Sequence, residues 1–300
     1  MGGAEHAKKV SVILVSYNTA GHVLAALEAL EGQAHEVIVV DNASRDKTVE
    51  LVKERHPGVK LIINTRNRGF GAANNQALDA MTGDLALLLN SDCVPEPGAV
   101  AKLAEAFKDP SVVAAGGRLL NPDGSLQESA CSRLTLWVVV CEQLLTYRLF
   151  PKSRVFNPYY LSARLVGGSG GPFHVAQVMG ACLMMRPVAR FDERFFLYCE
   201  DTELCLRLSR MGKIVYDPMA VFTHELGVSS KENRWWSVAC YNYGKELYFR
   251  IHHGLAAQWA CYAVNRLGAL LRIALKPRGS RLWLRVLGTG ISGPPLPDDA

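Results

Sequence analysis

Three carboxylates and one histidine stand where a folded chain can use them for chemistry. Asp41 closes the apolar run EVIVVD, Asp92 ends the tripeptide NSD after LALLLN, and Asp201 is the second acid of an ED pair that opens a helical pattern. A carboxylate can accept hydrogen bonds from a nucleoside, hold a hard cation or take a proton. His224, which follows the run KIVYDP, can add an imidazole to a metal site.

The ends of the first two apolar runs predict a nucleotide site. Residues 16–18 (Ser16, Tyr17, Asn18) end the first run, and Asp41 with Asn42 ends the second. A carboxylate accepts from a base N–H or from ribose hydroxyls, and an aromatic ring packs on the base. The structural alternative is an Asx turn at 41–42 followed by a helix capped by Ser44, and the residues alone weigh the two evenly.

The segment NTRNRGFGAANNQAL (64–78) strengthens the nucleotide interpretation. Gly69 and Gly71 let the backbone turn sharply or approach a ligand, and Arg66 and Arg68 can face phosphate charge. Neither GxGxxG nor the GKS/T of a P-loop is present.

Asn90, Ser91 and Asp92 contain a single acid, which raises the question of whether they hold a metal. Mg²⁺ and Mn²⁺ keep water and take one or two carboxylates together with substrate phosphates, so one carboxylate suffices. A capped turn before VPEPG is an equal alternative on this stretch alone.

Glu200 and Asp201 stand at a helix start, where the helix N-terminus is expected to lower the pKa of a carboxylate and keep it ionised as a base. In isolation, capping of the helix with Glu203 as the box partner is favoured. A structural role is likewise favoured for a lone histidine such as His224. Gly227, Ser229 and Ser230 suggest a flexible segment that closes over phosphates.

The runs that carry these residues predict an α/β fold. Short apolar runs at 10–16, 36–41, 59–64 and 84–90 suit strands covered on both faces, and helical patterns at 21–32 and 47–58 separate them. This alternation is typical of a doubly wound, mostly parallel sheet flanked by helices, in which ligands gather at the carboxyl ends of the strands.

The later chain is less regular. SVVAAGGRLL, VMGACLMMR and KIVYDP predict strands, the last stopped by its proline, and DTELCLRLSRMG predicts a helix. Residues 132–151 form an apolar helix candidate, for which an ordinary core helix is favoured, and 165–174 is expected to be a mobile loop. From about residue 231 the chain turns helical and amphipathic, and 291–300 is predicted to be a disordered tail.

Composition indicates a folded protein: 49% of the 300 residues are hydrophobic and the net charge is +5. From Arg266 onward six Lys and Arg residues face only Asp298 and Asp299, a basic and apolar combination that suits an anionic membrane surface rather than nucleic acid. The eight scattered cysteines predict reduced core residues in a cytosolic compartment. The start MGGAEHAKKV contains no apolar signal-peptide region, and neither export nor a membrane-spanning helix is expected.

Taken together and in order, the motifs VSYN, VVDNAS, NRGFGAANN, LLLNSD, DGSLQES, MGACLMMR, FDERFFLYCEDTELCLR and HELGVSS resemble inverting family 2 glycosyltransferases of the GT-A fold, in the bacterial rhamnosyltransferase-like branch. The resemblance runs from about residue 10 to 230. It implies a catalytic domain at 1–230, a helical, membrane-associating region at 231–290 and the tail at 291–300.

The resemblance also implies roles for individual residues. Asp201 matches the catalytic base, and Asp92 and His224 match the ligands of a Mg²⁺ or Mn²⁺ ion. Glu200 and Arg207 fall beside the base, on the acceptor side or behind it, although Arg207 also fits a surface position. The donor diphosphate sugar is expected to bind at the residues that follow the strands and in the loop between them: Ser16, Tyr17, Asn18, Asp41, Asn42, Arg68, Gly69, Asn90 and Ser91.

The implied reaction moves a sugar, with rhamnose from dTDP-rhamnose as the first candidate, to a hydroxyl of a lipid-linked or cell-envelope glycan. The implied location is the cytoplasmic face of the bacterial plasma membrane. Because NSD lacks the further acids of fuller motifs, metal binding is expected to depend on the donor diphosphate. Other UDP-linked donors, such as a UDP-hexose or UDP-galactofuranose, a non-catalytic binding or scaffold protein, and a homodimer remain open. A nucleotidyltransferase is disfavoured, because SYNTAGHV is not a glycine-rich basic loop.

Overall fold

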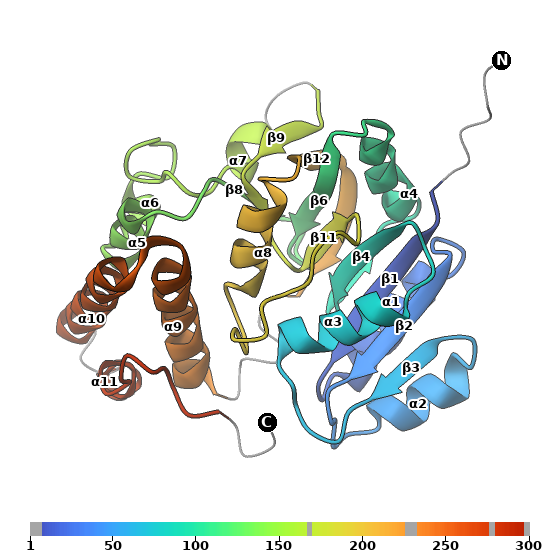
Figure 1. Ribbon diagram of the computed structural model, residues 1–300, viewed down its shortest axis with the longest axis horizontal. Coiled ribbons are helices and arrows are strands. Elements are labelled where there is room, and N and C mark those ends of the chain that lie inside the picture. The colour runs from blue at the N-terminus through green and yellow to red at the C-terminus, as the bar shows by residue number, and fades with distance from the viewer. Residues whose placement is uncertain (1–7, 167–169, 226–232, 276–279, 297–300) are drawn as a thin grey trace.

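A central mixed sheet with helices on both faces makes up most of the molecule (Figure 1). The computed structural model describes residues 8–166, 170–225, 233–275 and 280–296. The strands are β1 (Val10–Ser16), β2 (Glu36–Asp41), β3 (Lys60–Ile63), β4 (Leu85–Asn90), β5 (Cys93–Pro95), β6 (Val112–Leu120), β7 (Leu126–Gln127), β8 (Ala130–Cys131), β9 (Phe173–Val175), β10 (Gln177–Val178), β11 (Cys182–Met185) and β12 (Lys213–His224).

Helices follow most of these strands and complete the layers. They are α1 (Ala20–Leu30), α2 (Thr48–Arg55), α3 (Phe70–Ala80), α4 (Ala99–Ala104), the 3₁₀ helix η1 (Glu105–Lys108), α5 (Leu136–Gln143), α6 (Thr146–Leu149), α7 (Ser162–Leu165), α8 (Glu200–Leu208), α9 (Arg234–His253), α10 (Leu255–Leu275) and α11 (Ser280–Leu287).

The order of the main sheet is β3-β2-β1-β4-β11-β6-β12-β5. Strands β1 to β4 are parallel, and β11 is antiparallel to both of its neighbours. In this register Ser16 pairs with Asp41, and Val15 pairs with Asn90. The predicted doubly wound, mostly parallel sheet is therefore confirmed, and the predicted site residues of β1, β2 and β4 share one edge.

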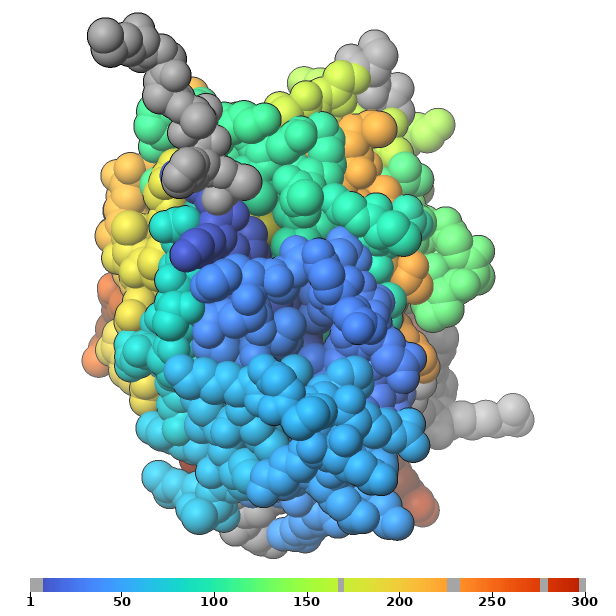
Figure 2. Space-filling view, turned by 90° about the vertical axis from the view of Figure 1, so that its right-hand side faces the viewer, coloured from blue at the N-terminus to red at the C-terminus, as the bar shows by residue number. Residues whose placement is uncertain are grey.

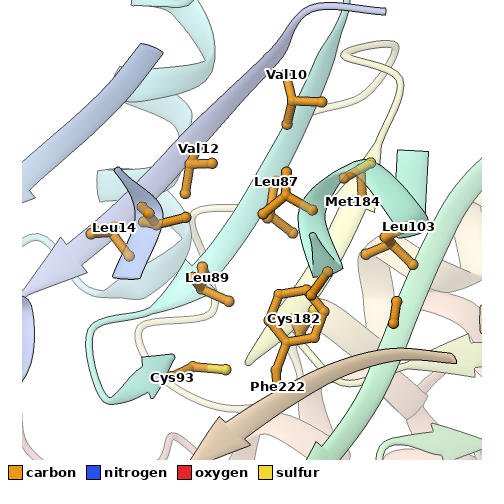
Figure 3. Packing of buried hydrophobic residues seen from close by; sticks show 14 of the residues in the cluster. Val10, Val12, Leu14, Leu87, Leu89, Cys93, Leu103, Cys182, Met184 and Phe222 are labelled. Atoms are coloured by element: carbon orange, nitrogen blue, oxygen red, sulfur yellow. The ribbon is translucent and has the colours of Figure 1, made fainter. Parts of the chain in front are cut away.

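Alternate residues of the strands feed two separate cores, as expected for a sheet covered on both faces. Val12, Leu14, Leu87 and Leu89 point to one side, where Figure 3 shows them packed with Met184, Leu103 and Phe222. Their neighbours Ile13, Ile38 and Leu88 point to the other side, toward α3 and α8. All eight cysteines are free and buried, which confirms their prediction as core residues.

A helical layer of α5, α9, α10 and α11 packs at the end of the molecule away from β3 (Figure 1). Its interior is partly polar: Lys245 Nζ lies 3.1 Å from Glu142 Oε2, and Gln143 donates to Asn265 at 3.0 Å and accepts from Arg272 at 3.0 Å. This network joins three helices. Figure 2 shows the opposite end, where α1, α2 and β3 form the surface.

Two predicted elements differ in the structure, and several short strands were not predicted. Strand β12 does not stop at Pro218 but continues to His224, because the register shifts between Asp217 and Val221, and a bulge accommodates proline within a strand. The helix expected at 132–151 breaks into α5 and α6 at Leu145, which has a φ of 58°. The structure also contains the short strands β5 and β7 to β10, which the sequence patterns did not predict.

The expected tail is partly ordered. Trp236 Nε1 donates to the carbonyl of Pro295 at 2.7 Å, so residues up to 296 lie against α9. The predicted phosphate-closing segment with Gly227, Ser229 and Ser230, and the last four residues of the tail, lie outside the described residues.

Candidate active site

Asp41 has one oxygen bound to the protein and one without a partner. Its Oδ2 accepts from the backbone N–H of Ser44 at 3.0 Å, which is three residues on and so one residue further than in the Asx turn that the sequence offered. Its Oδ1 is buried without a hydrogen-bond partner. Because buried polar atoms are nearly always satisfied, this oxygen is available to a donor group of a ligand. A backbone contact and an unpartnered acceptor therefore coexist in one side chain.

Asn42 and Gly69 shape the loop that follows β3 rather than presenting free groups. Asn42 Nδ2 donates to Asn67 Oδ1 and to the carbonyl of Gly69, while its Oδ1 accepts from Asn64 Nδ2 and from the backbone of Arg68. All its hydrogen-bonding capacity is used in this way. Gly69 has a φ of 80°, which a residue with a side chain rarely adopts.

The side chains at the end of β1 join neighbouring segments. Ser16 Oγ lies 3.1 Å from Thr19 Oγ1, which donates to Ser91 Oγ at 3.1 Å. Asn18 accepts from the backbone of Arg45 at 2.7 Å. The hydroxyl chain therefore joins the predicted nucleotide site to the NSD turn, while Tyr17 is half-buried beside it.

Asn90, Asp92 and His224 come together, although His224 is more than 130 residues away along the chain. Pairing of β5 with β12 sets Cys93 opposite His224. His224 Nε2 lies 3.2 Å from Asp92 Oδ1 and 3.3 Å from Asn90 Nδ2, and both His224 and Asp92 are largely buried. The pairing that the resemblance implied for these two residues is present in the structure.

Asp201 lies at the start of α8, and its carboxylate is held by another element. Its Oδ2 accepts from the backbone N–H of Gly180 at 2.8 Å, and its Oδ1 accepts from the N–H of Thr202 at 2.7 Å. Cys199 stands at the N-cap position of α8, with no side-chain cap hydrogen bond. The contact with Gly180 goes beyond simple capping and fixes the direction of the carboxylate.

The pKa of Asp201 shifts opposite to the sequence prediction. Burial raises the pKa of this carboxyl above its usual value, and the hydrogen bonds from Gly180 and Thr202 oppose the shift without cancelling it. The prediction of a lowered pKa was wrong because it considered the helix N-terminus without the cost of burial. A raised pKa makes the carboxylate a stronger base.

Gly180 and Ala181 connect the carboxylate of Asp201 to the NSD turn. Gly180 donates to Asp201, and the next carbonyl, that of Ala181, accepts from the backbone N–H of Asn90 at 3.1 Å. A Cβ on Gly180 would lie 3.1 Å from Cβ of Asp201, which is closer than ordinary packing. Two consecutive residues before β11 thus contact both Asp201 and the NSD turn.

Glu200 precedes Asp201 in α8 and forms no ion pair among the described residues. Its side chain is buried, and its Oε2 has no hydrogen-bond partner. Burial, with a further contribution from the charge of Asp201, raises the pKa of Glu200 to about 8. The chain therefore carries a protonated Glu200 beside an ionisable Asp201 at neutral pH.

Replacing Glu200 with Gln is expected to change how stability depends on pH. Unfolding lets Glu200 ionise near its usual pKa of 4.5, whereas the folded chain keeps the proton up to about 8, so stability falls as pH rises through that window. Glu200→Gln removes this loss, which is on the order of a few kcal/mol above the window. Urea unfolding at a series of pH values measures it.

Exposed Glu54 on α2 offers a matched control for that experiment. Glu54→Gln should follow the wild-type pH dependence. If Glu200→Gln also follows it, Glu200 does not keep its proton in the folded chain.

Arg207 and Arg68 form ion pairs with other side chains. Arg207 donates to Glu203 from Nε at 2.8 Å and from Nη2 at 2.7 Å, and Nη2 also donates to the carbonyl of Arg190. His252 of α9 lies 3.3 Å from the same Glu203. The contact with Arg190 joins α8 to the segment that precedes it, and the place of Arg207 beside the acceptor stays a prediction. Arg68, 4.0 Å from Glu193, is partly exposed and retains freedom to face an anion.

Residues 11–166 match the family described as Glycosyl transferase family 2. The chain belongs to this family. It is 30% identical over 234 residues to an N-acetylglucosaminyl-diphospho-decaprenol L-rhamnosyltransferase of Mycobacterium tuberculosis, a match that covers 71% of this chain and 75% of the relative. The protein is therefore a glycosyltransferase that uses a nucleotide sugar.

Two solved structures support the same fold. The structure of GalNAc-T7 with UDP, GalNAc and Mn²⁺ has a TM-score of 0.58 at 14% identity, over 82% of this chain and 48% of that one. The mannosyltransferase PcManGT from Pyrobaculum calidifontis, in complex with GDP-Man and Mn²⁺, has a TM-score of 0.54 at 18% identity, over 93% and 81%. The predicted GT-A-type fold is confirmed by these likenesses.

The residues of the transferase fit a divalent cation that is shared with a ligand. Among the described residues, no group of three or more His, Cys, Asp and Glu side chains is placed to hold a metal. Asp92 and His224 nevertheless supply an oxygen and a nitrogen within 3.2 Å of each other, and Asn90 adds an amide. Mn²⁺ accepts oxygen and imidazole ligands, and donor phosphates can complete its shell.

Proposed function

We propose that the transferase moves a sugar from a nucleoside diphosphate to a hydroxyl of a lipid-linked glycan, with inversion at the anomeric carbon. The observation that carries this proposal is the buried carboxylate of Asp201, held by Gly180 next to the turn that bears Asp92. The similarity to a decaprenol-linked rhamnosyltransferase supports dTDP-rhamnose as donor and a polyprenyl-linked sugar as acceptor.

Asp201 is the proposed base. It takes the proton of the acceptor hydroxyl while that oxygen bonds to the anomeric carbon, from the face opposite the nucleotide. The bond to the nucleoside diphosphate breaks at the same time, and the electron pair leaves with the phosphate oxygen. One base is sufficient because no covalent intermediate forms, in contrast to the two carboxylates that a retaining hydrolase uses.

The donor is proposed to lie along the edge formed by β2, β1 and β4. Asp41 Oδ1, buried and unpaired, is placed to accept from the base or the ribose. Asp92, His224 and Asn90 face the diphosphate and would hold the cation. That cation, when bound, supplies Lewis-acid stabilisation of the charge on the leaving phosphate.

A donor and acceptor panel tests this proposal. Purified protein is incubated with dTDP-rhamnose, a UDP-hexose or UDP-galactofuranose, with and without polyprenyl-diphosphate-linked N-acetylglucosamine, and release of nucleoside diphosphate is measured. We expect release that requires both substrates and is fastest with dTDP-rhamnose. Equal release of nucleoside diphosphate without an acceptor would contradict sugar transfer. Faster release from another donor would identify that donor, rather than dTDP-rhamnose, as the substrate.

We also propose that the helical layer rests on an anionic membrane surface. No described helix is long and apolar enough to cross a membrane. Two segments contain no Asp or Glu: residues 144–165, which follow α5, and residues 254–288 of the layer itself. They expose large apolar side chains: Leu149, Phe150, Val155, Trp259, Leu267, Leu270, Leu275 and Leu284. Apolar side chains among cations suit the interface of an anionic bilayer.

Reversing two exposed charges in these segments is expected to weaken binding to anionic vesicles. Arg154 and Arg281 lie on the two segments and are exposed. Because each cation near such a surface contributes about 1 kcal/mol, Arg154→Glu with Arg281→Glu should lower vesicle affinity by about 30-fold or more. Co-sedimentation with vesicles containing phosphatidylglycerol measures this.

The matched control reverses Lys53 and Arg55, which are exposed on α2 at the other end of the molecule. This control should bind vesicles as the wild type does. An equal loss in both double variants would show that net charge alone is responsible. Substitution is preferable to truncation at residue 254, because Asn265 and Arg272 complete the buried network around Gln143.

A further inference from the structure

We propose that Gln127 is a positioning residue that fixes the tautomer and direction of the His224 ring. The turn at 121–125 determines which end of the Gln127 amide faces that ring. The inference rests on the proposed function in one respect, namely that His224 acts at the donor diphosphate. Neither Gln127 nor the turn was assigned a role from the sequence.

Gln127 touches His224 at two places. It lies in β7, which pairs antiparallel with β6, and its side chain is 7% exposed. Its Nε2 donates to the carbonyl of His224 at 3.2 Å and to Asn121 Oδ1 at 2.8 Å. Its Oε1 lies 2.7 Å from His224 Nδ1. One amide thus holds both the backbone and the ring of the histidine.

The direction of these hydrogen bonds is fixed from the turn outward. Asp123 Oδ1 lies 2.6 Å from Ser125 Oγ, and an ionised carboxylate only accepts, so the hydroxyl must donate to it. The Ser125 hydroxyl holds the pKa of Asp123 below its usual value, which keeps the carboxylate ionised. Ser125 Oγ is then left to accept from Asn121 Nδ2 at 2.9 Å.

That assignment determines the two amides. With Asn121 Nδ2 facing Ser125, its Oδ1 faces Gln127 and must accept from Nε2. Turning Gln127 over would set its oxygen against Asn121 Oδ1 and against the carbonyl of His224. Turning Asn121 over would set its oxygen against Ser125 Oγ, whose hydrogen is already donated to Asp123. Gln127 Oε1 therefore faces the ring, and His224 Nδ1 must carry a proton to donate to it.

The consequence falls on the other ring nitrogen. In the neutral ring, a proton on Nδ1 leaves a lone pair on Nε2, the atom 3.2 Å from Asp92 Oδ1 and 3.3 Å from Asn90 Nδ2. The Nε2 lone pair and the Asp92 carboxylate can then both coordinate a cation. A proton on Nε2 would instead be donated to Asp92, and neither atom would be free to coordinate. Partners of this kind typically orient metal-binding histidines.

Nuclear magnetic resonance of histidine-labelled, metal-free protein tests the tautomer directly. The ring carbon and nitrogen shifts distinguish the two neutral forms at a pH well above the usual histidine value of about 6.5. The His224 signal is identified by its absence in His224→Asn. We expect the form protonated on Nδ1 in the wild type.

Gln127→Met keeps the length of the side chain and removes the acceptor. We expect this variant to populate the form protonated on Nε2, with the proton donated to Asp92. Binding of Mn²⁺ in the presence of dTDP, followed by electron paramagnetic resonance, should weaken by about 10–100-fold in Gln127→Met. Gln143→Met removes a buried glutamine from the helical layer instead, and it should leave both readouts unchanged.

Two results would overturn the inference: a wild-type ring protonated on Nε2, or an unchanged tautomer in Gln127→Met. The wild-type result needs no variant, so failure of Gln127→Met to fold does not remove the test. Because the resonance measurement uses neither metal nor sugar, it gives its answer even if the transfer reaction itself is absent.

Discussion

Asp201→Asn is expected to lower turnover by about 10²–10⁴-fold and to leave nucleotide sugar affinity within a few-fold of the wild type. The amide keeps the shape and can still accept from Gly180, so the site should remain assembled. It cannot take a proton from the acceptor hydroxyl. Nucleoside diphosphate release measures turnover, and calorimetry with the donor measures affinity.

Asp79→Asn is a suitable control for that substitution, because Asp79 is an exposed carboxylate of α3 that pairs with Arg190. It should change neither quantity. A non-catalytic, nucleotide-sugar-binding protein of the same fold would show no difference between Asp201→Asn and wild type. A loss of donor affinity equal to the loss of turnover would instead indicate that Asp201 holds the donor.

The second large effect is expected at Asp92. Chelation with EDTA should stop transfer, and Mg²⁺ or Mn²⁺ should restore it in the wild type. Replacing a residue that only orients a metal ligand typically lowers metal affinity or activity by about 10–100-fold. Asp92 is itself a proposed ligand, so Asp92→Ala should lower metal-dependent activity by more than that. With few protein ligands of its own, the site should bind the ion weakly until the donor diphosphate arrives.

Titrating Mn²⁺ with and without dTDP separates these possibilities. Wild type should bind the ion tightly only with the nucleotide, and Asp92→Ala should lose that gain. Asp84→Asn, an exposed carboxylate before β4, should behave as wild type. Full activity in chelator would contradict the metal role of Asp92 and His224.

Much of the fold follows from local patterns. The runs at 10–16, 36–41 and 84–90 are β1, β2 and β4 within a residue, because continuous apolar runs between short helices have few other stable arrangements. The polar residue that closes each run falls at the shared carboxyl edge for the same reason. Asp41 and Asp92 were thus predictable as site candidates from the residues alone.

The remaining features depend on contacts between distant segments. Gly180 meets Asp201 through an antiparallel strand, β11, whose order in the sheet no local pattern reveals. Gln127 meets His224 from a strand of two residues, which is too short to show a period. The raised pKa of Asp201 reflects burial, and burial is set by the packing of the whole chain.

Part of the signal for these residues was present in the sequence. Gly180 falls within MGACLMMR and Gln127 within DGSLQES, two of the motifs that carry the family resemblance. A glycine before a strand and an amide after a turn have many structural uses, so neither could be given a role without its partner. The partners become visible only in the folded chain.

The anomeric configuration of the product tests the central proposal most directly. The transferase is incubated with dTDP-rhamnose and polyprenyl-diphosphate-linked N-acetylglucosamine, and the one-bond carbon–hydrogen coupling at the new linkage is measured. We predict a configuration opposite to that of the donor, formed by wild type and not by Asp201→Asn. A product with the donor's configuration would contradict transfer by a single base.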